Sequence, residues 1–207
     1  MNYLAIDTAS SALKVLIKHG ERRKYFQSDD FKSASESLLP VVDRLLGELN
    51  ITLKDLDTLA CVIGPGSFTG IRIGMSSVKA IAYALDKKVV AVNSLQLLAY
   101  NNTGADTVIA AVDAGNGYRY TAVYDGNAEE IMPPKCLLAE EFDGFIGMVD
   151  EPYAFFSDAS AGGKIPSKES FMRAMEKAVD SGVPIHFNDI EPLYIRKPQA
   201  ERDLENK

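Results

Sequence analysis

The sequence has few of the residues from which catalytic and metal sites are most often built. Among its 207 residues there is no tryptophan, and there are only two histidines and two cysteines. His19 and His186 cannot form a His-x-x-x-His or His-Glu-x-x-His pair, which excludes a zinc site of that kind. We interpret His19 as a solvated turn residue and His186 as a structural histidine.

The cysteines also lack a functional spacing. Cys61 lies in an apolar, strand-like run and is predicted to be a buried free thiol, and Cys136 is far from it in sequence. Unpaired thiols are typical of a reducing compartment. The Gly-x-Ser-x-Gly elbow of serine hydrolases is absent as well. We therefore expect neither a catalytic residue nor a metal site.

The sequence contains fewer basic than acidic residues. Lysine and arginine number 22 against 29 acidic residues, so the net charge is −7. The one dense basic run, residues 22–24, fits a solvated strand, whereas gripping nucleic acid requires clustered Lys and Arg. The N-terminus does not resemble a signal peptide, and no apolar run approaches membrane-spanning length. The expected location is the cytoplasm, without membrane contact.

The apolar periodicity predicts an α/β chain with a mixed sheet and two lobes. A polar stretch at 101–106 is expected to separate an N-terminal lobe, residues 1–101, from a smaller C-terminal lobe, residues 102–207. Expected strands are 3–8, 12–18, 22–28, 58–63, 88–92, 108–112, 119–124 and 153–156. Five helices are expected. The first begins with a capping box at 33–36 and ends near Asn50, and the second spans 68–85. The third is capped by Ser94 and ends at about 100, the fourth spans 139–149, and the fifth runs from Ser167 to near 181.

The segment GPGSFTGIRIG, from Gly64 to Gly74, joins a buried strand to a long helix. Gly64, Gly66 and Ser67 could cradle a phosphate at the helix N-terminus, with Asp7 facing phosphate or magnesium. The segment has neither the lysine of a Walker A motif nor a dinucleotide fingerprint.

The alternative interpretation of the same residues is structural. Gly70 and Gly74 share one helix face, which would let another backbone approach closely. Asp7 would then accept hydrogen bonds from the amides of the turn that follows it. The sequence leaves both interpretations open.

Two helices, 35–49 and 68–85, are apolar or small around most of their circumference. Such helices are usually buried on more than one side, and two of them in a chain of this size suggest a protein partner. The residues predicted to form that partner interface are Leu39, Val42, Leu46, Phe68, Gly70, Arg72, Ile73, Gly74 and Tyr83.

Four stretches together resemble the TsaB (YeaZ) family: IDTAS at 6–10, SESLLP at 35–40, GPGSFTGIRIG at 64–74 and EPLYIRK at 191–197. The resemblance implies a two-lobed, actin-like or Hsp70-like ATPase fold with a reduced second lobe. It also implies a role in making threonylcarbamoyladenosine, next to the anticodon of tRNAs that read codons beginning with A.

The same resemblance implies a scaffold without catalysis of its own. Its partner TsaD would carry the metal and the transferase site and would form a heterodimer with this chain through a helix bundle. TsaE would engage the pair, TsaC would make the threonylcarbamoyl-adenylate donor, and tRNA would be contacted only through the complex. No intrinsic cofactor is expected, and ATP or ADP with magnesium would bind at the partner interface.

The chain departs from the family pattern at two places. Ala34 stands where the family usually has His, and Gly115-Asn116 stand where it usually has basic residues after Asp113-Ala114. One alternative function is a small-molecule kinase or ATPase of the same fold that uses Asp7 and the Gly64–Ser67 loop. A metallopeptidase would need a ligand set that the sequence lacks. A third alternative is self-association of the helix face across a two-fold axis when TsaD is absent.

Overall fold

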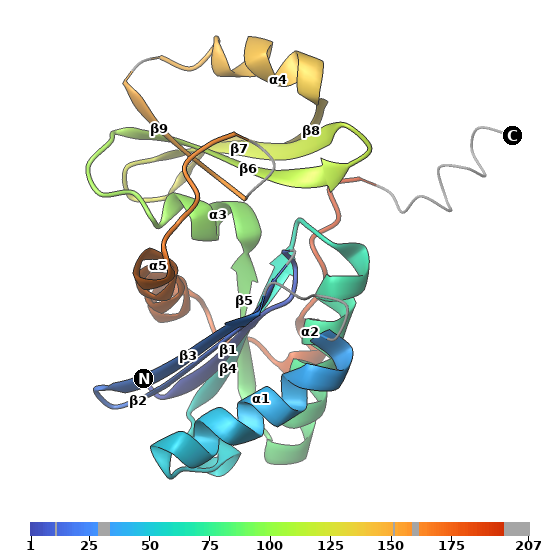
Figure 1. Ribbon diagram of the computed structural model, residues 1–207, viewed down its shortest axis with the longest axis vertical. Coiled ribbons are helices and arrows are strands. Elements are labelled where there is room, and N and C mark those ends of the chain that lie inside the picture. The colour runs from blue at the N-terminus through green and yellow to red at the C-terminus, as the bar shows by residue number, and fades with distance from the viewer. Residues whose placement is uncertain (11, 29–33, 151, 159–161, 197–207) are drawn as a thin grey trace, which may run out of the picture.

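The chain folds into two β-sheets with helices packed on their faces (Figure 1). The computed structural model describes residues 1–10, 12–28, 34–150, 152–158 and 162–196. The first sheet has five strands in the order β3-β2-β1-β4-β5, and the second has four in the order β8-β7-β6-β9. Within the described residues, no helix is both long and apolar enough to cross a membrane.

The first sheet contains the predicted meander and two parallel strands. Strands β1 (Tyr3–Asp7), β2 (Leu13–His19) and β3 (Arg22–Ser28) pair antiparallel, as the alternation of apolar and polar residues predicts. Strands β4 (Thr58–Gly64) and β5 (Lys88–Asn93) extend the sheet from β1 in parallel. Both faces of β1 and β4 are buried, which explains their continuous apolar sequences.

Helices α1 (Ala34–Leu49) and α2 (Phe68–Leu85) cover one face of this sheet. The strand register places Ile6, Val15 and Phe26 on that face. The guanidinium of Arg44 in α1 lies 5.1 Å from the centre of the Phe26 ring, and Gly74 of α2 lies against Ile6. The two helices therefore share one side of the sheet, as Figure 1 shows at the lower right.

The helix ends follow from local capping, with one correction. Ser67 caps α2 by accepting a hydrogen bond from the amide of Gly70 at 3.1 Å, and Asn50 ends α1 with φ +54°. The cap of α3 (Ser94–Ala99) is Asn93 rather than the predicted Ser94, because the Asn93 side chain accepts from the Leu95 amide at 2.8 Å. The capping box predicted at Ser33 lies outside the described residues.

The second sheet contains the predicted hairpin and one strand that the sequence did not reveal. Strands β6 (Thr107–Gly115) and β7 (Tyr118–Asp125) are joined by a turn in which Asn116 and Gly117 have φ of +54° and +77°. Strand β8 (Glu130–Leu138), which is not among the expected strands, contains Pro133 and Pro134. It is an edge strand, where one side needs no donors, so prolines are tolerated.

Helices cover both faces of the second sheet. The short helix α3 contributes Leu95 and Ala99 to one core, and α4 (Ala139–Ile146) contributes Phe142 and Phe145 to the core on the opposite face. Strand β9 (Tyr153–Ser157) completes the sheet by pairing in parallel with β6.

The chain returns to the first sheet after the second is complete. Helix α5 (Lys168–Ser181) buries Phe171, Ala174 and Met175 in the first core, on the face opposite α1 and α2. A one-turn helix, η3 (Phe187–Asp189), follows, and a similar turn, η2 (Leu53–Asp55), precedes β4. The predicted boundary near residue 101 remains a prediction, but the packing of α5 shows that residues after 102 also build the first core.

Candidate functional site

The glycine loop between β4 and α2 is packed against this chain's own backbone on both sides. A Cβ atom on Gly66 would collide with the carbonyl of Ala9, and the Ser67 amide donates to that same carbonyl at 2.7 Å. On the other side, a Cβ atom on Gly64 would lie 2.8 Å from Ile71 Cδ1 and 3.0 Å from the carbonyl oxygen of Leu193. The glycines therefore serve close approach within the chain.

Three amides of the loop and of the first turns of α2 are bonded within the chain. The Ser67 amide bonds to Ala9, the Gly70 amide to the Ser67 side chain, and the Ile71 amide to the Ser67 carbonyl at 2.9 Å. An anion at a helix N-terminus needs free amides that point at it. The amides of Ser67 and Gly70 are therefore engaged within the chain, and phosphate binding at this loop stays a prediction.

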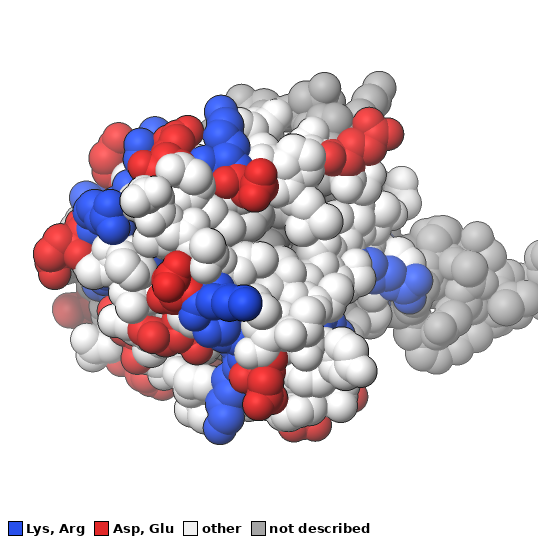
Figure 2. All heavy atoms as spheres, turned by 90° about the horizontal axis from the view of Figure 1, so that it is seen from below, with Lys and Arg blue, Asp and Glu red and all other residues white. Residues whose placement is uncertain are grey.

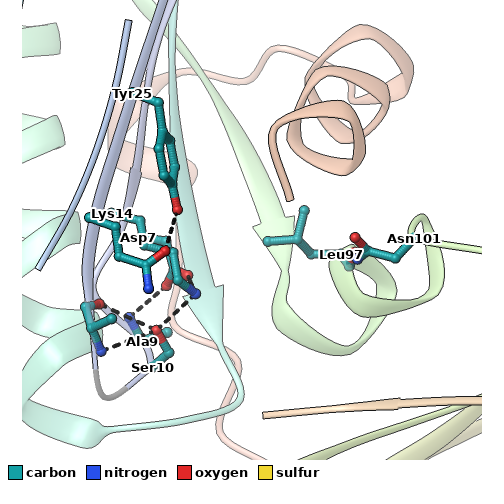
Figure 3. Close-up of polar contacts among 9 residues, drawn as sticks. Asp7, Ala9, Ser10, Lys14, Tyr25, Leu97 and Asn101 are labelled. Carbon is teal, nitrogen blue, oxygen red and sulfur yellow. Dashed lines mark hydrogen bonds and ion pairs between the residues drawn. The ribbon is translucent and has the colours of Figure 1, made fainter. Parts of the chain in front are cut away.

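Asp7 lies at the end of β1 and is paired with a lysine of the same sheet (Figure 3). Its carboxylate accepts from the Ala9 amide at 2.9 Å and from Lys14 Nζ at 3.1 Å, and Asp7 is only 4% exposed. The structural interpretation of Asp7 as an acceptor for turn amides is confirmed.

Lys14 is the cation that lies beside Asp7, at 3.1 Å from its carboxylate. Besides the ion pair, its ammonium lies 3.2 Å from Ser10 Oγ and 4.5 Å from the centre of the Phe171 ring. A single carboxylate whose charge is balanced by a fixed ammonium is a poor magnesium ligand, because magnesium needs several oxygen ligands. In this arrangement the Asp7 carboxylate is engaged by Lys14 and by the Ala9 amide, and its binding of magnesium or nucleotide stays a prediction.

The two helix glycines pack against the first strand. The Thr8 hydroxyl donates to the carbonyl of Gly70 at 2.7 Å, and a Cβ atom on Gly74 would collide with the Thr8 hydroxyl oxygen. The two glycines therefore allow close packing within the chain, but at Gly74 the neighbours are the side chains of Thr8, Cys61 and Ile6 rather than the predicted second backbone. Both glycines are buried, which removes them from the predicted partner interface.

The other predicted interface residues divide by exposure. Val42 and Leu46 are only 2% and 6% exposed, because they pack in the first core, and they are corrected to core residues. Ile73 is half-buried against the same core. The exposed members are Leu39 at 55%, Phe68 at 39%, Arg72, and Tyr83 at 75%.

These four exposed residues, Leu39, Phe68, Arg72 and Tyr83, are called the α1/α2 face below. Phe68 and Arg72 are four positions apart on α2, and Arg72 and Tyr83 are eleven apart, so the three lie on one side of the helix. Leu39 belongs to the neighbouring α1, on the same side of the sheet. Contact of this face with another protein remains a prediction.

Sequence reasoning assigned no role to Tyr194, which the structure places beside the α1/α2 face. Its ring stacks on Phe68 with centroids 5.3 Å apart, and its hydroxyl accepts from Arg72 Nε at 3.2 Å. The guanidinium of Arg72 in turn lies 3.9 Å from the centre of the Phe68 ring. The tail motif EPLYIRK was the available signal, but its position in sequence did not indicate which element it contacts.

The turn between β6 and β7 has a structural explanation. The Asp113 side chain accepts from the Gly115 amide at 3.0 Å, and the Asp113 amide donates to Asp158 at 2.9 Å. Asp113 therefore stabilises this turn through its side chain. The Ala34 side chain, where the family has His, lies outside the described part of the chain.

The histidines and cysteines occupy ordinary structural positions. His186 Nδ1 accepts from the Asn188 amide at 3.2 Å, and His19 Nδ1 lies 3.4 Å from Arg22. Burial, with a smaller contribution from Asp7, raises the pKa of the Cys61 thiol far above its usual range. Among the described residues, no three His, Cys, Asp or Glu side chains are grouped to hold a metal ion.

A surface hollow lies between helix α5 and residues 126–128, and the glycine loop does not line it. It measures about 700 Å³ and lies beside α5, where Arg173 and Lys177 alternate with Glu176 and Asp180. Asp7, Gly64, Gly66 and Ser67 are not among its lining residues. On the face seen in Figure 2, acidic and basic side chains alternate without a continuous patch of one sign. On this face, the described residues therefore form no continuous basic patch of the kind that binds a row of phosphates.

Comparisons with known proteins agree with one another. The family model described as "TsaD: tRNA N6-adenosine threonylcarbamoyltransferase" matches residues 31–176. The "tRNA threonylcarbamoyladenosine biosynthesis protein TsaB" of Bacillus subtilis is 31% identical over 160 residues, which are 75% of this chain and 70% of that protein. The Escherichia coli protein of the same name is 34% identical over 128 residues, 60% of this chain and 55% of that protein.

Two solved structures match this chain over nearly its whole length. The structure titled "YeaZ from Pseudomonas aeruginosa" has a TM-score of 0.72 and 27% identity, and the match covers 93% of this chain and 99% of that one. A second Pseudomonas aeruginosa structure, described as similar to "peptidase YEAZ", has a TM-score of 0.75, also at 27% identity, with 94% and 99% covered.

Proposed function

The chain belongs to the TsaB (YeaZ) family of tRNA threonylcarbamoyladenosine biosynthesis proteins, and we propose that it is a non-catalytic subunit that binds the transferase TsaD. Its architecture of mixed sheets with helices on both faces is the α/β, actin-like ATPase-type fold. In this proposal the chain acts by binding TsaD through an exposed surface.

The observation that carries the proposal is the α1/α2 face. Leu39, Phe68 and Tyr83 are exposed by 55%, 39% and 75%, and Arg72 lies between the aromatic residues on α2. Large apolar and aromatic side chains with an arginine are the composition of residues that dominate binding energy at protein interfaces. Helices packed edge to edge on a sheet also present a rigid surface, which lowers the entropic cost of binding.

The arrangement around Asp7 supports a subunit without its own nucleotide chemistry. Lys14 neutralises the Asp7 carboxylate, and the amides of Ser67 and Gly70 are bonded within the chain. The proposal therefore assigns the metal and the transferase chemistry to TsaD. TsaE would join the pair, and tRNA would be reached only through the complex. ATP or ADP with magnesium, where the complex uses it, is expected at the contact with TsaD.

A kinase or ATPase that uses Asp7 and Gly64–Ser67 is the competing function. No contact described above favours it, because the carboxylate and the loop are both engaged within the chain. Purified protein with an ATP turnover that Asp7→Asn abolishes would support the enzyme and count against a subunit role.

The binding proposal is tested with two exposed residues, Leu39 and Tyr83, of which Tyr83 also contacts the Phe187 ring edge-on, with ring centroids 5.7 Å apart. We expect Leu39→Glu with Tyr83→Ala to weaken binding to TsaD by about a hundredfold or more, since central interface residues typically contribute at least 1–2 kcal/mol each. Isothermal titration calorimetry measures this directly. Arg72→Glu is a less clean variant, because Arg72 also holds Tyr194.

The matched control is Met148→Glu. Met148 is 79% exposed and follows α4 on the second lobe, so the same kind of change is made at an apolar surface position far from the α1/α2 face in sequence. The control variant should bind TsaD like the wild type. Unchanged affinity of the folded Leu39→Glu, Tyr83→Ala protein would remove the α1/α2 face from the interface.

A further inference from the structure

The C-terminal segment Glu191–Arg196, called the strap below, contacts three separate parts of the molecule within six residues. It has no helix or strand of its own. Its first contact is with the first sheet, where the Leu193 amide donates to the carbonyl of Ile63 at 2.9 Å. The carbonyl of Leu193 comes so close to Gly64, whose φ is +111°, that a side chain there would meet it.

The next residue of the strap contacts α2. Tyr194 stacks on Phe68 and accepts a hydrogen bond from Arg72, and the Phe68–Arg72 pair is itself stacked. The three side chains form a closed triangle of contacts that joins two α2 residues to the strap. The ring of Tyr194 therefore limits the rotamers that Phe68 and Arg72 can adopt.

The last two residues of the strap contact the second sheet. Ile195 packs against the core that contains Leu95, Val108 and Tyr124. The guanidinium of Arg196 lies 3.6 Å from the centre of the Tyr118 ring, at the start of β7. An extended residue spans at most about 3.6 Å, so the contacts of Tyr194, Ile195 and Arg196 lie within a very short length of chain.

We propose that the strap couples the α1/α2 face to the second sheet, with Tyr194 positioning Phe68 and Arg72 and with Ile195 and Arg196 anchoring the same segment on the second lobe. A partner that binds Phe68 and Arg72 in this arrangement stabilises the strap, and the anchored strap increases the affinity of the face by the same factor. The link to a partner rests on the proposed function. The coupling within the chain does not.

Hydrogen–deuterium exchange of the full chain tests the coupling. The variants are Tyr194→Ala, which removes the contact with α2, and Arg196→Ala, which removes the contact with Tyr118. Each is expected to speed exchange both at the N-terminal turns of α2 and at β7 near Tyr118. An aromatic or cation–π contact is worth a factor of roughly three to ten in local opening, so the acceleration should be of that order.

The matched control is Val183→Ala, since Val183 is 77% exposed and lies outside the strap and both of its contact sites. It should leave both exchange rates unchanged. The coupling would be contradicted if each strap variant speeds amide exchange only beside its own deleted contact. In that case Tyr194→Ala would leave β7 unchanged and Arg196→Ala would leave α2 unchanged.

Binding to purified TsaD tests the link to the partner with a residue that lies away from the α1/α2 face. Arg196→Ala, whose stacking contact is on the second sheet, is expected to weaken binding several-fold. Tyr194→Phe keeps the ring and loses the bond to Arg72, so its affinity should fall between those of Tyr194→Ala and the wild type.

The outcomes separate the two proposals. A wild-type chain that does not bind TsaD contradicts the proposed function, and the exchange experiment still decides the coupling. A wild-type chain that binds, together with an Arg196→Ala variant of equal affinity, contradicts the link between the strap and the partner face.

Discussion

At the scale of single residues, the glycines of the loop and of α2 are fixed by three different neighbours. Gly64 faces the strap, Gly66 faces Ala9, and Gly74 faces Thr8. The sequence predicts that small residues here allow close approach, and it offers phosphate as an alternative neighbour. The sequence does not identify the neighbour. A glycine shows that there is no side chain at that position, but it does not show which atoms occupy the space.

Gly74→Ala tests this packing. The new methyl group would collide with the buried Thr8 hydroxyl, so we expect a loss of about 1–3 kcal/mol in the free energy of unfolding, as for other overpacked cores. The control is Gly47→Ala in α1, where nothing lies within 4 Å of the new methyl group. That change should stabilise the protein by up to about 1 kcal/mol, since alanine is the better helix former. Urea unfolding of both variants measures the difference, and equal effects would contradict the packing.

Lys14→Met tests whether Lys14 neutralises Asp7. The side chains of Lys14 and Asp7 are only 18% and 5% exposed. Removing the lysine would therefore leave a buried carboxylate without its counter-charge. We expect a loss of about 2 kcal/mol in stability, with partial recovery in the Asp7→Asn, Lys14→Met double variant.

A surface ion pair provides the comparison for Lys14. Lys24 and Glu48 approach to 2.9 Å with side chains 41% and 40% exposed, so Lys24→Met should have little measurable effect. If Lys14→Met were equally harmless in thermal and urea unfolding, the Asp7 carboxylate would have to be balanced in another way.

At the scale of elements, the sequence predicted helices better than it predicted what covers them. The bounds of α2 match the prediction, because its apolar period, its Ser67 cap and the flanking glycines agree. The wide apolar arcs of α1 and α2 were assigned to a partner, yet Val42 and Leu46 are buried by the chain's own sheet. A helix packed on a sheet and beside another helix needs the same wide arc, so composition alone cannot separate the two causes.

Helix α5 is the element whose position the sequence could not supply. Its periodicity and its Ser167 cap predict a helix, but nothing local indicates that it packs on the first sheet after the chain has built the second. Strand β8 was missed for a local reason, because Pro133 and Pro134 are compatible with a strand only at a sheet edge.

The cap of α5 should therefore affect the first core. Ser167 accepts from the Ser170 amide at 3.2 Å, and Ser167→Ala is expected to lower the free energy of unfolding by about 1 kcal/mol. Ser167→Asp should restore most of the loss, because aspartate also caps and its charge suits a helix N-terminus. Circular dichroism during urea unfolding gives both values, and failure of Ser167→Asp to recover stability would count against a capping role.

At the scale of the whole molecule, Cys61 reports on global unfolding. It lies in β4 with no exposed surface, and burial and Asp7 raise the pKa of its thiol. Because only the thiolate reacts, the native protein should show one thiol reactive with a disulfide reagent at pH 8, Cys136, and two after denaturation. Two rapidly reacting thiols in the native protein would contradict the burial of β4.

The same thiol gives a direction for stability against pH. The unfolded state loses its Cys61 proton near the ordinary value of 9.0, whereas the folded state keeps it. Below that pH both states hold the proton, and above it the unfolded state is favoured. The contribution of Cys61 to stability is therefore present below about pH 9 and falls as the pH rises further. Cys61→Ala should reduce this alkaline loss in urea unfolding measured from pH 7 to 10.

The central claim is that this chain supports threonylcarbamoyladenosine synthesis through its surface rather than through a catalytic site. Depleting the protein and analysing the nucleosides of bulk tRNA tests it most directly, with complementation by wild type, by Asp7→Asn and by the Leu39→Glu, Tyr83→Ala variant. We predict that depletion lowers threonylcarbamoyladenosine, that wild type and Asp7→Asn restore it, and that the surface variant does not. Unchanged threonylcarbamoyladenosine after depletion, or rescue by the surface variant but not by Asp7→Asn, would contradict the account.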